Sequence, residues 1–214
     1  MSASDAGAGR AAAAPAAVPG PAAAADHYPV QLEIDYTRKH SRIMLFLRLL
    51  LVIPHLVVLT VLYVISSILT LVAAVAVLIT RHYPKGIFNF NVGVARYGWR
   101  VTAYMLMLTD RFPPFALTAH EKYPVRFRIE YPGSVARWRV LFAWLVALPV
   151  LLIVYVLMAV LEILTFLVFF ILLITARYPK GLFGLNVGIL RLNARAGAYA
   201  GFMCTQYPPF DLAG

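Results

Sequence analysis

The 214-residue chain has few of the residues on which most enzyme chemistry depends. It contains one cysteine, Cys204, which excludes an internal disulfide and a metal cluster built on cysteines. Only nine residues are acidic, and none are spaced like the paired carboxylates of a hydrolase or a metal-dependent lipid phosphatase. The five histidines form no HExxH arrangement, and the glycines form no phosphate-binding loop. We therefore expect no enzyme activity, no catalytic residue, no metal and no cofactor.

Charge is also scarce, and one sign dominates it. Charged residues make up 13% of the chain and apolar residues 62%, whereas soluble domains carry about 25% charged residues. This composition excludes an ordinary soluble domain. Lysine and arginine number 19 against 9 acids, which gives a net charge of +10. In so apolar a chain, the surplus indicates anionic phospholipid rather than nucleic acid as a partner.

Residues 1–27 consist mainly of alanine, with some glycine, proline and serine. Such a segment buries too little apolar surface to offset the entropy of ordering it, so we predict that it is disordered. It has no run of leucine, valine or phenylalanine that could form the apolar part of a secretory signal. We expect a later apolar segment to direct insertion into the membrane.

The rest of the chain is a duplication. The sequence YPVQLEIDY at 28–36 recurs 95 residues later as YPVRFRIEY, and the same offset relates every later element without a gap. A repeat of this length is a small structural module rather than one unit of a solenoid. We therefore divide the chain into a first membrane repeat at 28–118, a linker at 119–122 and a second membrane repeat at 123–214.

Each repeat begins with a strand pattern. Apolar and polar residues alternate strictly over 30–36 and 125–131, as in a half-buried strand. Two of the three polar positions carry acids in the first copy, and two of the three carry arginines in the second. We predict that the two strands pair with each other, with Glu33 and Asp35 facing Arg126 and Arg128.

A long apolar run follows each strand, at 43–80 and 140–175. One straight helix of this length would measure about 55 Å, against a hydrocarbon core of about 30 Å. We therefore predict an α-helical integral membrane protein in which each run folds into a two-helix hairpin. The hairpins would turn near Ser66-Ser67 and near 158–162, and they would either cross the bilayer or re-enter it.

Basic residues flank both ends of both apolar runs. Hairpins would bring all of these residues to one face, which is the cytoplasmic one because positive charge stays inside. We expect a multi-pass protein of the plasma membrane with both termini in the cytoplasm. Glu162 would then lie in a water-exposed turn, and the alternative is an intramembrane proton or cation site.

A Tyr-Pro-Lys-Gly turn follows each apolar run, where proline and glycine are expected to end the helix. Its residues are Tyr83, Pro84, Lys85 and Gly86 in the first repeat and Tyr178, Pro179, Lys180 and Gly181 in the second. After each turn we predict an amphipathic helix lying in the membrane interface, roughly over 89–109 and 184–204. Each of these helices ends before a Pro-Pro-Phe sequence.

These motifs, with an Ile-Pro or Leu-Pro pair in each apolar run at 53–54 and 148–149, resemble a family of small actinobacterial membrane modules. The family is catalogued as domain of unknown function 4389, here in tandem over 28–117 and 123–212. The resemblance implies a membrane location and an actinobacterial source, and it brings no activity, substrate or catalytic residue. The second copy departs from the pattern, with Thr205 in place of Asp110.

Within the amphipathic helix, the residues identical in both copies fall on one face. They include two arginines and a tyrosine in each copy, namely Arg96, Arg100 and Tyr104, and Arg191, Arg195 and Tyr199. One hypothesis is a stripe that binds lipid headgroups or a partner. The other is that the arginines snorkel, or pair internally with Asp35 and Glu130.

The most favoured function from sequence is a noncatalytic accessory or scaffold subunit of a larger membrane assembly. It would contact anionic phospholipid at the cytoplasmic face and bind another membrane protein. The alternative is a small transporter or channel with a path between the two repeats, for which matched threonines, Thr70 and Thr165, are candidate polar residues. A membrane-bound lipid enzyme is the third and least favoured class.

Overall fold

The structure, a computed structural model, describes residues 28–212. The tail predicted to be disordered lies outside the described residues. Each repeat contributes one short strand, one long helix and one shorter helix, so the protein is mostly helical. In chain order the elements are β1 (Val30–Ile34), α1 (Arg42–Thr80), α2 (Lys85–Met105), β2 (Val125–Ile129), α3 (Arg137–Thr175) and α4 (Lys180–Ala200).

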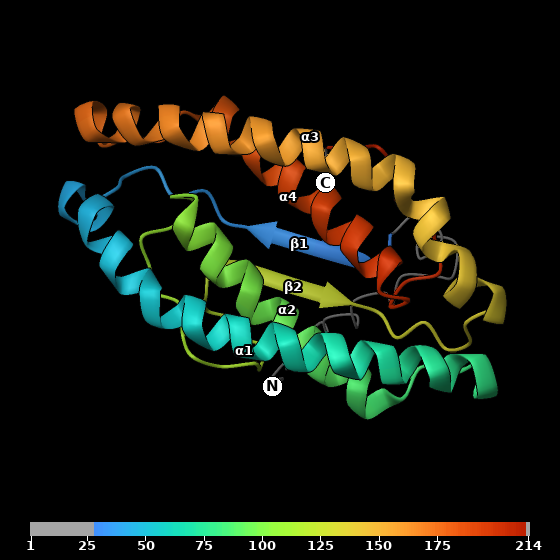
Figure 1. The fold of residues 1–214 in the computed structure, drawn as a ribbon. Coiled ribbons are helices and arrows are strands. Elements are labelled where there is room, and N and C mark those ends of the chain that lie inside the picture. The colour runs from blue at the N-terminus through green and yellow to red at the C-terminus, as the bar shows by residue number, and fades with distance from the viewer. Residues whose placement is uncertain (1–27, 213–214) are drawn as a thin grey trace, which may run out of the picture.

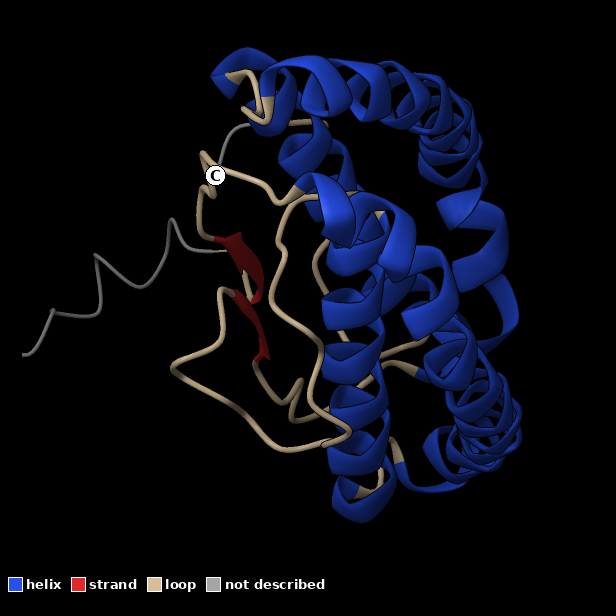
Figure 2. Ribbon diagram, turned by 90° about the vertical axis from the view of Figure 1, so that its left-hand side faces the viewer, coloured by secondary structure: helices blue, strands red, loops and turns tan. Residues whose placement is uncertain are grey.

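The elements form three layers. The β1–β2 ribbon lies on one side of the helices (Figure 2). Helices α2 and α4 form the middle layer, because α2 contacts β2 and α1, while α4 contacts β1 and α3. The long helices α1 and α3 form the outer layer and are bowed around the middle one (Figure 1). Each strand therefore packs on the shorter helix of the other repeat.

The predicted pairing of the two strands is confirmed. They form an antiparallel ribbon in which Leu32 lies opposite Phe127. These two residues occupy equivalent positions in the two repeats, so an approximate twofold axis passes between them. Arg126 bonds to Glu33 at 3.0 Å and to Asp35 at 2.7 Å. Arg128, expected to take part in the same pattern, binds Glu121 instead.

The predicted hairpins are wrong, because α1 and α3 are each one continuous helix of 39 residues. Between residues 55 and 80, and between 150 and 175, there is no proline or glycine to break the helix. The Ser67 hydroxyl donates to the Tyr63 carbonyl at 2.7 Å, so it is satisfied within the helix and forms no turn. Glu162 accordingly lies exposed in the middle of α3 and not in a turn.

The amphipathic helices also differ from expectation. They begin at Lys85 and Lys180, four residues earlier than predicted, with Pro84 and Pro179 in extended conformation as the N-cap residues. Proline suits this place since its missing N–H has no partner in the first turn of a helix. The helices lie between two protein layers and not at the surface, and Arg81, with φ 62°, ends α1 in place of the expected proline or glycine.

The long helices are apolar on most of their circumference. They are the two described helices that are long and apolar enough to cross a membrane, and only 17% of the most apolar stretch of each is buried. The core helix of a soluble protein would be mostly buried. The exposed side chains run along the whole length of both helices and include Ile43, Leu49, Val57, Leu71 and Ile79 in α1, and Leu141, Leu152, Ile163, Phe166 and Ile174 in α3.

Candidate functional site

Two of the four arginines common to both repeats hold the ribbon. Arg96 of α2 donates through Nε to the Phe127 carbonyl at 3.1 Å. Arg191 of α4 donates through Nε to the Leu32 carbonyl at 3.0 Å. The acceptors are the two residues on the approximate twofold axis, and each arginine reaches the strand of the other repeat. These guanidinium groups therefore help to fix the ribbon on the middle layer.

The other two arginines hold the segment that follows each shorter helix. We call residues 111–118 and 206–212 the straps. Arg100 donates to two strap carbonyls, Ala116 at 3.0 Å and Thr118 at 2.6 Å. Arg195 donates to the Asp211 carbonyl at 3.1 Å. These are internal hydrogen bonds, but their partners are backbone carbonyls and not the acids considered from the sequence.

The glycines on the same helix face make room for the straps. A Cβ added at Gly93 would lie 3.0 Å from the Cβ of Leu117, and one added at Gly188 would lie 2.6 Å from the carbonyl oxygen of Leu212. The approach at Gly188 is closer than real Cβ atoms show, and the approach at Gly93 is tighter than most. The face whose residues recur in both repeats therefore carries the strap of its own repeat.

The two recurring tyrosines are buried and not available to lipid. Tyr104 lies under the guanidinium of Arg48, whose Cζ is 4.7 Å from the ring centroid. Tyr199 lies under Arg139 at 4.5 Å. Each arginine also donates to carbonyls just after the shorter helix, Arg48 to Thr109 at 3.3 Å and Arg139 to Cys204 at 2.8 Å.

The Tyr-Pro-Lys-Gly residues join the two repeats. The carbonyl of Tyr178 accepts a hydrogen bond from Tyr36, and the carbonyl of Tyr83 accepts one from Tyr131. The ammonium groups of Lys180 and Lys85 lie over the rings of those same donor tyrosines, at 6.0 and 5.6 Å. Gly86 and Gly181 have open space around them, so the turn acts through its other residues.

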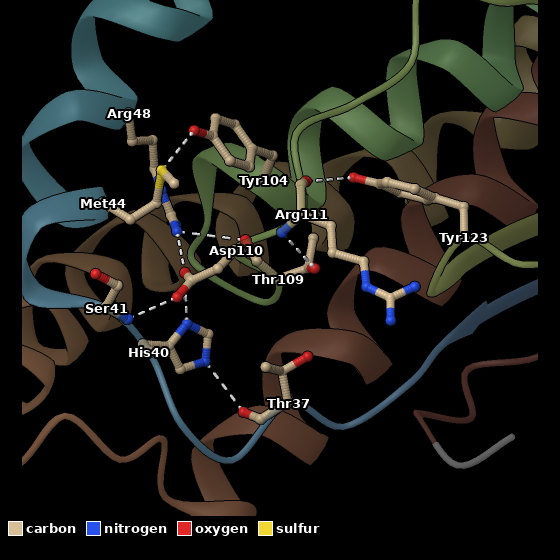
Figure 3. A network of polar contacts seen from close by, with 10 residues as sticks. All are labelled: Thr37, His40, Ser41, Met44, Arg48, Tyr104, Thr109, Asp110, Arg111 and Tyr123. Carbon is tan, nitrogen blue, oxygen red and sulfur yellow. Dashed lines mark hydrogen bonds and ion pairs between the residues drawn. The ribbon is translucent and has the colours of Figure 1, made fainter.

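The most connected polar cluster surrounds Asp110 (Figure 3). One carboxylate oxygen lies 2.8 Å from Nδ1 of His40 and 2.7 Å from Nη2 of Arg48, and the other accepts from the backbone N–H of Ser41 at 2.7 Å. His40 is held in turn by the Thr37 carbonyl at 3.0 Å. The cluster thus ties the start of the strap to the segment that enters α1.

Hydrogen bonding decides the charge state of this acid. Burial alone would raise the pKa of the Asp110 carboxyl, but the hydrogen bonds from the His40 ring and the Ser41 backbone N–H, with the charges of His40 and Arg48, hold its pKa below the ordinary value. A carboxylate engaged by three donors stabilises structure better than it accepts a proton from a substrate. Sequence reasoning assigned no site to Arg48 and left a role for Asp110 open.

Two segments of the chain, residues 42–117 and 137–211, match the family described as domain of unknown function DUF4389. The chain belongs to the DUF4389 family. The two matches confirm the predicted tandem copy, and each runs from the start of a long helix into a strap. No curated protein and no solved structure is detectably similar to the chain.

A basic pocket lies on the ribbon side of the molecule, between α2 of the first DUF4389 repeat and β2 of the second. Its volume is about 170 Å³, and its lining includes four arginines and one acid of the linker, namely Arg96, Arg100, Arg126, Arg128 and Glu121, of which Glu121 pairs with Arg128 at 3.0 Å. Burial and the positive charge of Arg128 lower the pKa of the Arg96 guanidinium. An anionic group would relieve this repulsion. At the equivalent place over α4, β1 of the first repeat supplies Gln31 and Glu33 in place of Arg126 and Arg128, so Arg191 and Arg195 lack basic neighbours of this kind.

A larger cavity of about 420 Å³ lies between the two DUF4389 repeats. Its wall includes the middle of α1 and α3, one face of α2 and α4, and Phe127 of the ribbon. The Asn91 side chain in this wall donates to Tyr83 of the Tyr-Pro-Lys-Gly turn at 3.0 Å. It also donates to Thr70 at 3.0 Å and accepts from Ser66 at 2.8 Å, which links the turn to α1. No residue of this cavity was predicted as a site from sequence, although Thr70 was considered for a transport path.

Proposed function

We propose that this protein is a noncatalytic membrane protein held in one leaflet by α1 and α3, and that it serves as an accessory or scaffold subunit of a larger membrane assembly. The observation that carries the proposal is the exposed apolar surface of these two helices, which lies on the side opposite the ribbon. Soluble proteins seldom expose apolar patches of such extent, and large ones mark contact with a membrane or a partner.

The length of the helices favours one leaflet over a crossing. A helix of 39 residues measures about 58 Å. To cross a core of about 30 Å with its ends at the boundaries, it would tilt by about 60°, beyond the 0–40° that membrane helices adopt. One leaflet has about 15 Å of hydrocarbon, enough for a helix about 10 Å wide. This placement keeps both ends of each helix at the same surface.

The basic residues at the helix ends support the same placement. Arg42 at the start of α1 donates to the Ile174 carbonyl at the end of α3, and Arg137 at the start of α3 donates to the Ile79 carbonyl at the end of α1. Each end of the molecule therefore carries a cluster of exposed bases beside the apolar face. One cluster is formed by Arg38, Lys39, Arg42, Arg177 and Lys180, and the other by Arg81, Lys85 and Arg137.

We assign the contacts with anionic phospholipid to these two clusters. A basic residue close to an anionic leaflet contributes about 1 kcal/mol to the free energy of membrane binding. The clusters lie where headgroups would meet the ends of helices immersed in the same leaflet. The four arginines of α2 and α4 are less suited to the task, since their guanidinium groups already bind backbone carbonyls.

The basic pocket at Arg96 and Arg100 supports a role for a protein partner. In the proposed placement it faces the cytoplasm, because the ribbon lies opposite the apolar face. Arg126 and Arg128 of this pocket pair with Glu33, Asp35 and Glu121 at the surface, and an acidic segment of another membrane protein would compete with these acids for them. The acid at Asp110 supports a noncatalytic role, since its oxygens are engaged by structural donors.

A cysteine-labelling experiment tests the placement. Single cysteines at Lys85 and at Lys180, in a Cys204→Ala background, lie at opposite ends of the molecule. In intact cells both should resist an impermeant maleimide, and both should react after permeabilisation. Reaction at only one of them in intact cells would mean that the helices cross the bilayer. Reaction at both would place the ribbon outside the cell and contradict the cytoplasmic orientation.

A small transporter or channel with a path between the repeats is the second candidate. Two observations favour it: the cavity between the repeats, and the exposed position of Glu162 in the middle of an apolar helix. An acid at such a place is a candidate proton or cation site. Vesicles containing the protein would then show an ion flux that Glu162→Gln abolishes, whereas a scaffold gives no flux in either form.

A further inference from the structure

The cavity between the repeats has the wall of a ligand site. Each of the four helices contributes to it, including Tyr63, Ser66 and Thr70 of α1 and Met158 of α3. Small residues, among them Ala194 and Gly197, keep the space open on the side of α4, and Gly98 of α2 makes room for the Tyr63 side chain. Its volume of about 420 Å³ lies within the 300–1,000 Å³ that is typical of small-molecule sites.

The residues that line this cavity are all uncharged. The wall is mainly apolar, with Trp99, Phe127, Met158 and Met203 as its largest side chains besides Tyr63. An anionic headgroup or a metal ion held here would lose its hydration without a compensating charge. A neutral ligand with an apolar body meets no such penalty.

Three polar groups of the wall make no hydrogen bond of normal strength within residues 28–212. They are the hydroxyl of Tyr63, the hydroxyl of Thr102 and the side-chain oxygen of Asn193. Threonine in a helix commonly donates to the carbonyl four residues earlier. The threonines of α1 and α3 do so, at Thr60, Thr70, Thr80, Thr165 and Thr175. Thr102 is thus left free to bond to a ligand.

The cavity wall extends to the apolar face at the middle of α1. Its lining includes Tyr63, Ser66 and Thr70 of α1 and Met158 of α3, the two helices that carry the exposed apolar surface. Tyr63 remains 48% exposed there and extends its hydroxyl over α2, to within 2.2 Å of the place where a Cβ at Gly98 would lie. A ligand dissolved in the leaflet would enter beside this tyrosine.

We propose that the cavity binds a neutral amphiphile, a single hydrocarbon chain that ends in uncharged hydroxyl or ester oxygens. The chain would lie against the apolar wall, and the oxygens would bond to Tyr63, Thr102 and Asn193. This ligand differs from the anionic phospholipid assigned to the exposed basic clusters. The route of entry rests on the proposed placement in the leaflet, whereas the fit of the ligand rests on the cavity alone.

Tryptophan fluorescence can separate these two claims. Trp99 lies in the cavity wall, while Trp144 is exposed on the apolar face of α3. Two proteins, each retaining one of these tryptophans and phenylalanine at the other two sites, would be placed in phosphatidylglycerol nanodiscs. Brominated phosphatidylglycerol should quench Trp144 and leave Trp99 largely unquenched. A small fraction of brominated monoacylglycerol should quench Trp99 along a saturable curve that unbrominated monoacylglycerol reverses.

A filled cavity provides the matched control. Gly197 lies in the wall with open space around it, and Gly184, on the same helix, has open space but lies outside the cavity. Gly197→Leu should abolish the saturable quenching of Trp99, while Gly184→Leu should leave it unchanged. Quenching that rises without saturation, that survives Gly197→Leu, or that oleate reverses as well as monoacylglycerol does would overturn the proposal. Failure to quench Trp144 would instead count against the placement in the membrane.

Discussion

Arg48 and Arg139 occupy positions four residues apart in the two repeats, yet two of their contacts are equivalent. Each guanidinium lies over the recurring tyrosine of its own repeat and donates to a carbonyl two residues before the strap, at Thr109 or Cys204. The equivalent of Arg139 in the first repeat is Met44. Because positions i and i+4 share one face of a helix, an arginine one turn away reaches the same site.

Because the arginine lies at either of two positions one helical turn apart, an arginine at position 44 should compensate for the loss of Arg48. Arg48→Ala should lower the free energy of unfolding by about 2 kcal/mol, because buried hydrogen bonds to a charged group are lost. Adding Met44→Arg recreates the arrangement of the second repeat and should recover about half of that loss. Chemical unfolding of the single and double variants in detergent measures both effects. A double variant no more stable than Arg48→Ala would show that the two arginines are not interchangeable.

Acid should weaken the Asp110 cluster. The lowered pKa of Asp110 means that its carboxylate stabilises the fold above the ordinary aspartate pKa of about 3.9, and that this contribution is lost as the pH falls through the lowered value. Asp110→Asn should be less stable than the original protein at neutral pH, and the difference should shrink below about pH 4. Unfolding measured across this range tests the sign, and Glu130→Gln, which alters an acid outside the cluster, should leave the dependence unchanged.

The strands could be predicted because alternation is visible within a few residues, and the duplication because the same sequence recurs 95 residues later. Strict alternation identifies a strand, and complementary charges at Glu33 and Arg126 identify its partner. The prediction of hairpins was wrong because it compared the length of each apolar run with the thickness of the bilayer, as if every helix stood upright in it. A helix that lies along the leaflet has no such limit, and nothing in the sequence near Ser67 or Glu162 breaks it.

The site could be predicted only in part. Comparison of the repeats at a fixed offset selected Arg96, Arg100 and Tyr104 as candidate site residues, and in the structure their partners are backbone carbonyls or come from another helix. No sequence pattern gives carbonyl positions. The same comparison treated Arg48 as lacking a counterpart, because Arg139 stands one helical turn away. A search that allowed shifts of three or four residues within a helix would have paired them.

The ion pairs of the ribbon should add little stability. Arg126 bonds to Glu33 and Asp35 at the surface, where both acids are more than half exposed, and the pairs raise the pKa of the guanidinium. Exposed cross-strand pairs contribute about 0.2–1 kcal/mol. A double-mutant cycle with Arg126→Ala and Asp35→Ala should give a coupling in this range that falls as salt is added. Coupling above it, or insensitive to salt, would contradict this account.

Two equivalent hydrogen bonds join the repeats, so substitutions at the two places can be compared directly. Tyr36 and Tyr131 donate to the Tyr178 and Tyr83 carbonyls in symmetry-related places. Tyr36→Phe and Tyr131→Phe should each lower the free energy of unfolding by about 1 kcal/mol. Tyr155→Phe, which alters a hydroxyl exposed on α3, should have no effect. Single variants that differ strongly from each other would show that the two repeats are not stabilised equivalently.

Lysine substitution separates the two roles considered for the arginines of α2 and α4. Arg100 donates to two strap carbonyls at once, a geometry that the single ammonium of lysine cannot reproduce. Replacing Arg96, Arg100, Arg191 and Arg195 together by lysine should therefore lower stability and expose the straps to protease. It should leave the number of bound anionic lipids seen by native mass spectrometry unchanged.

Neutralising the exposed cluster residues Arg38, Lys39 and Arg177 should do the reverse, reducing bound anionic lipid with little change in stability. If the lysine variant instead lost lipid at unchanged stability, the stripe on the recurring helix face would be the lipid site after all, and the carbonyl contacts would be secondary to it.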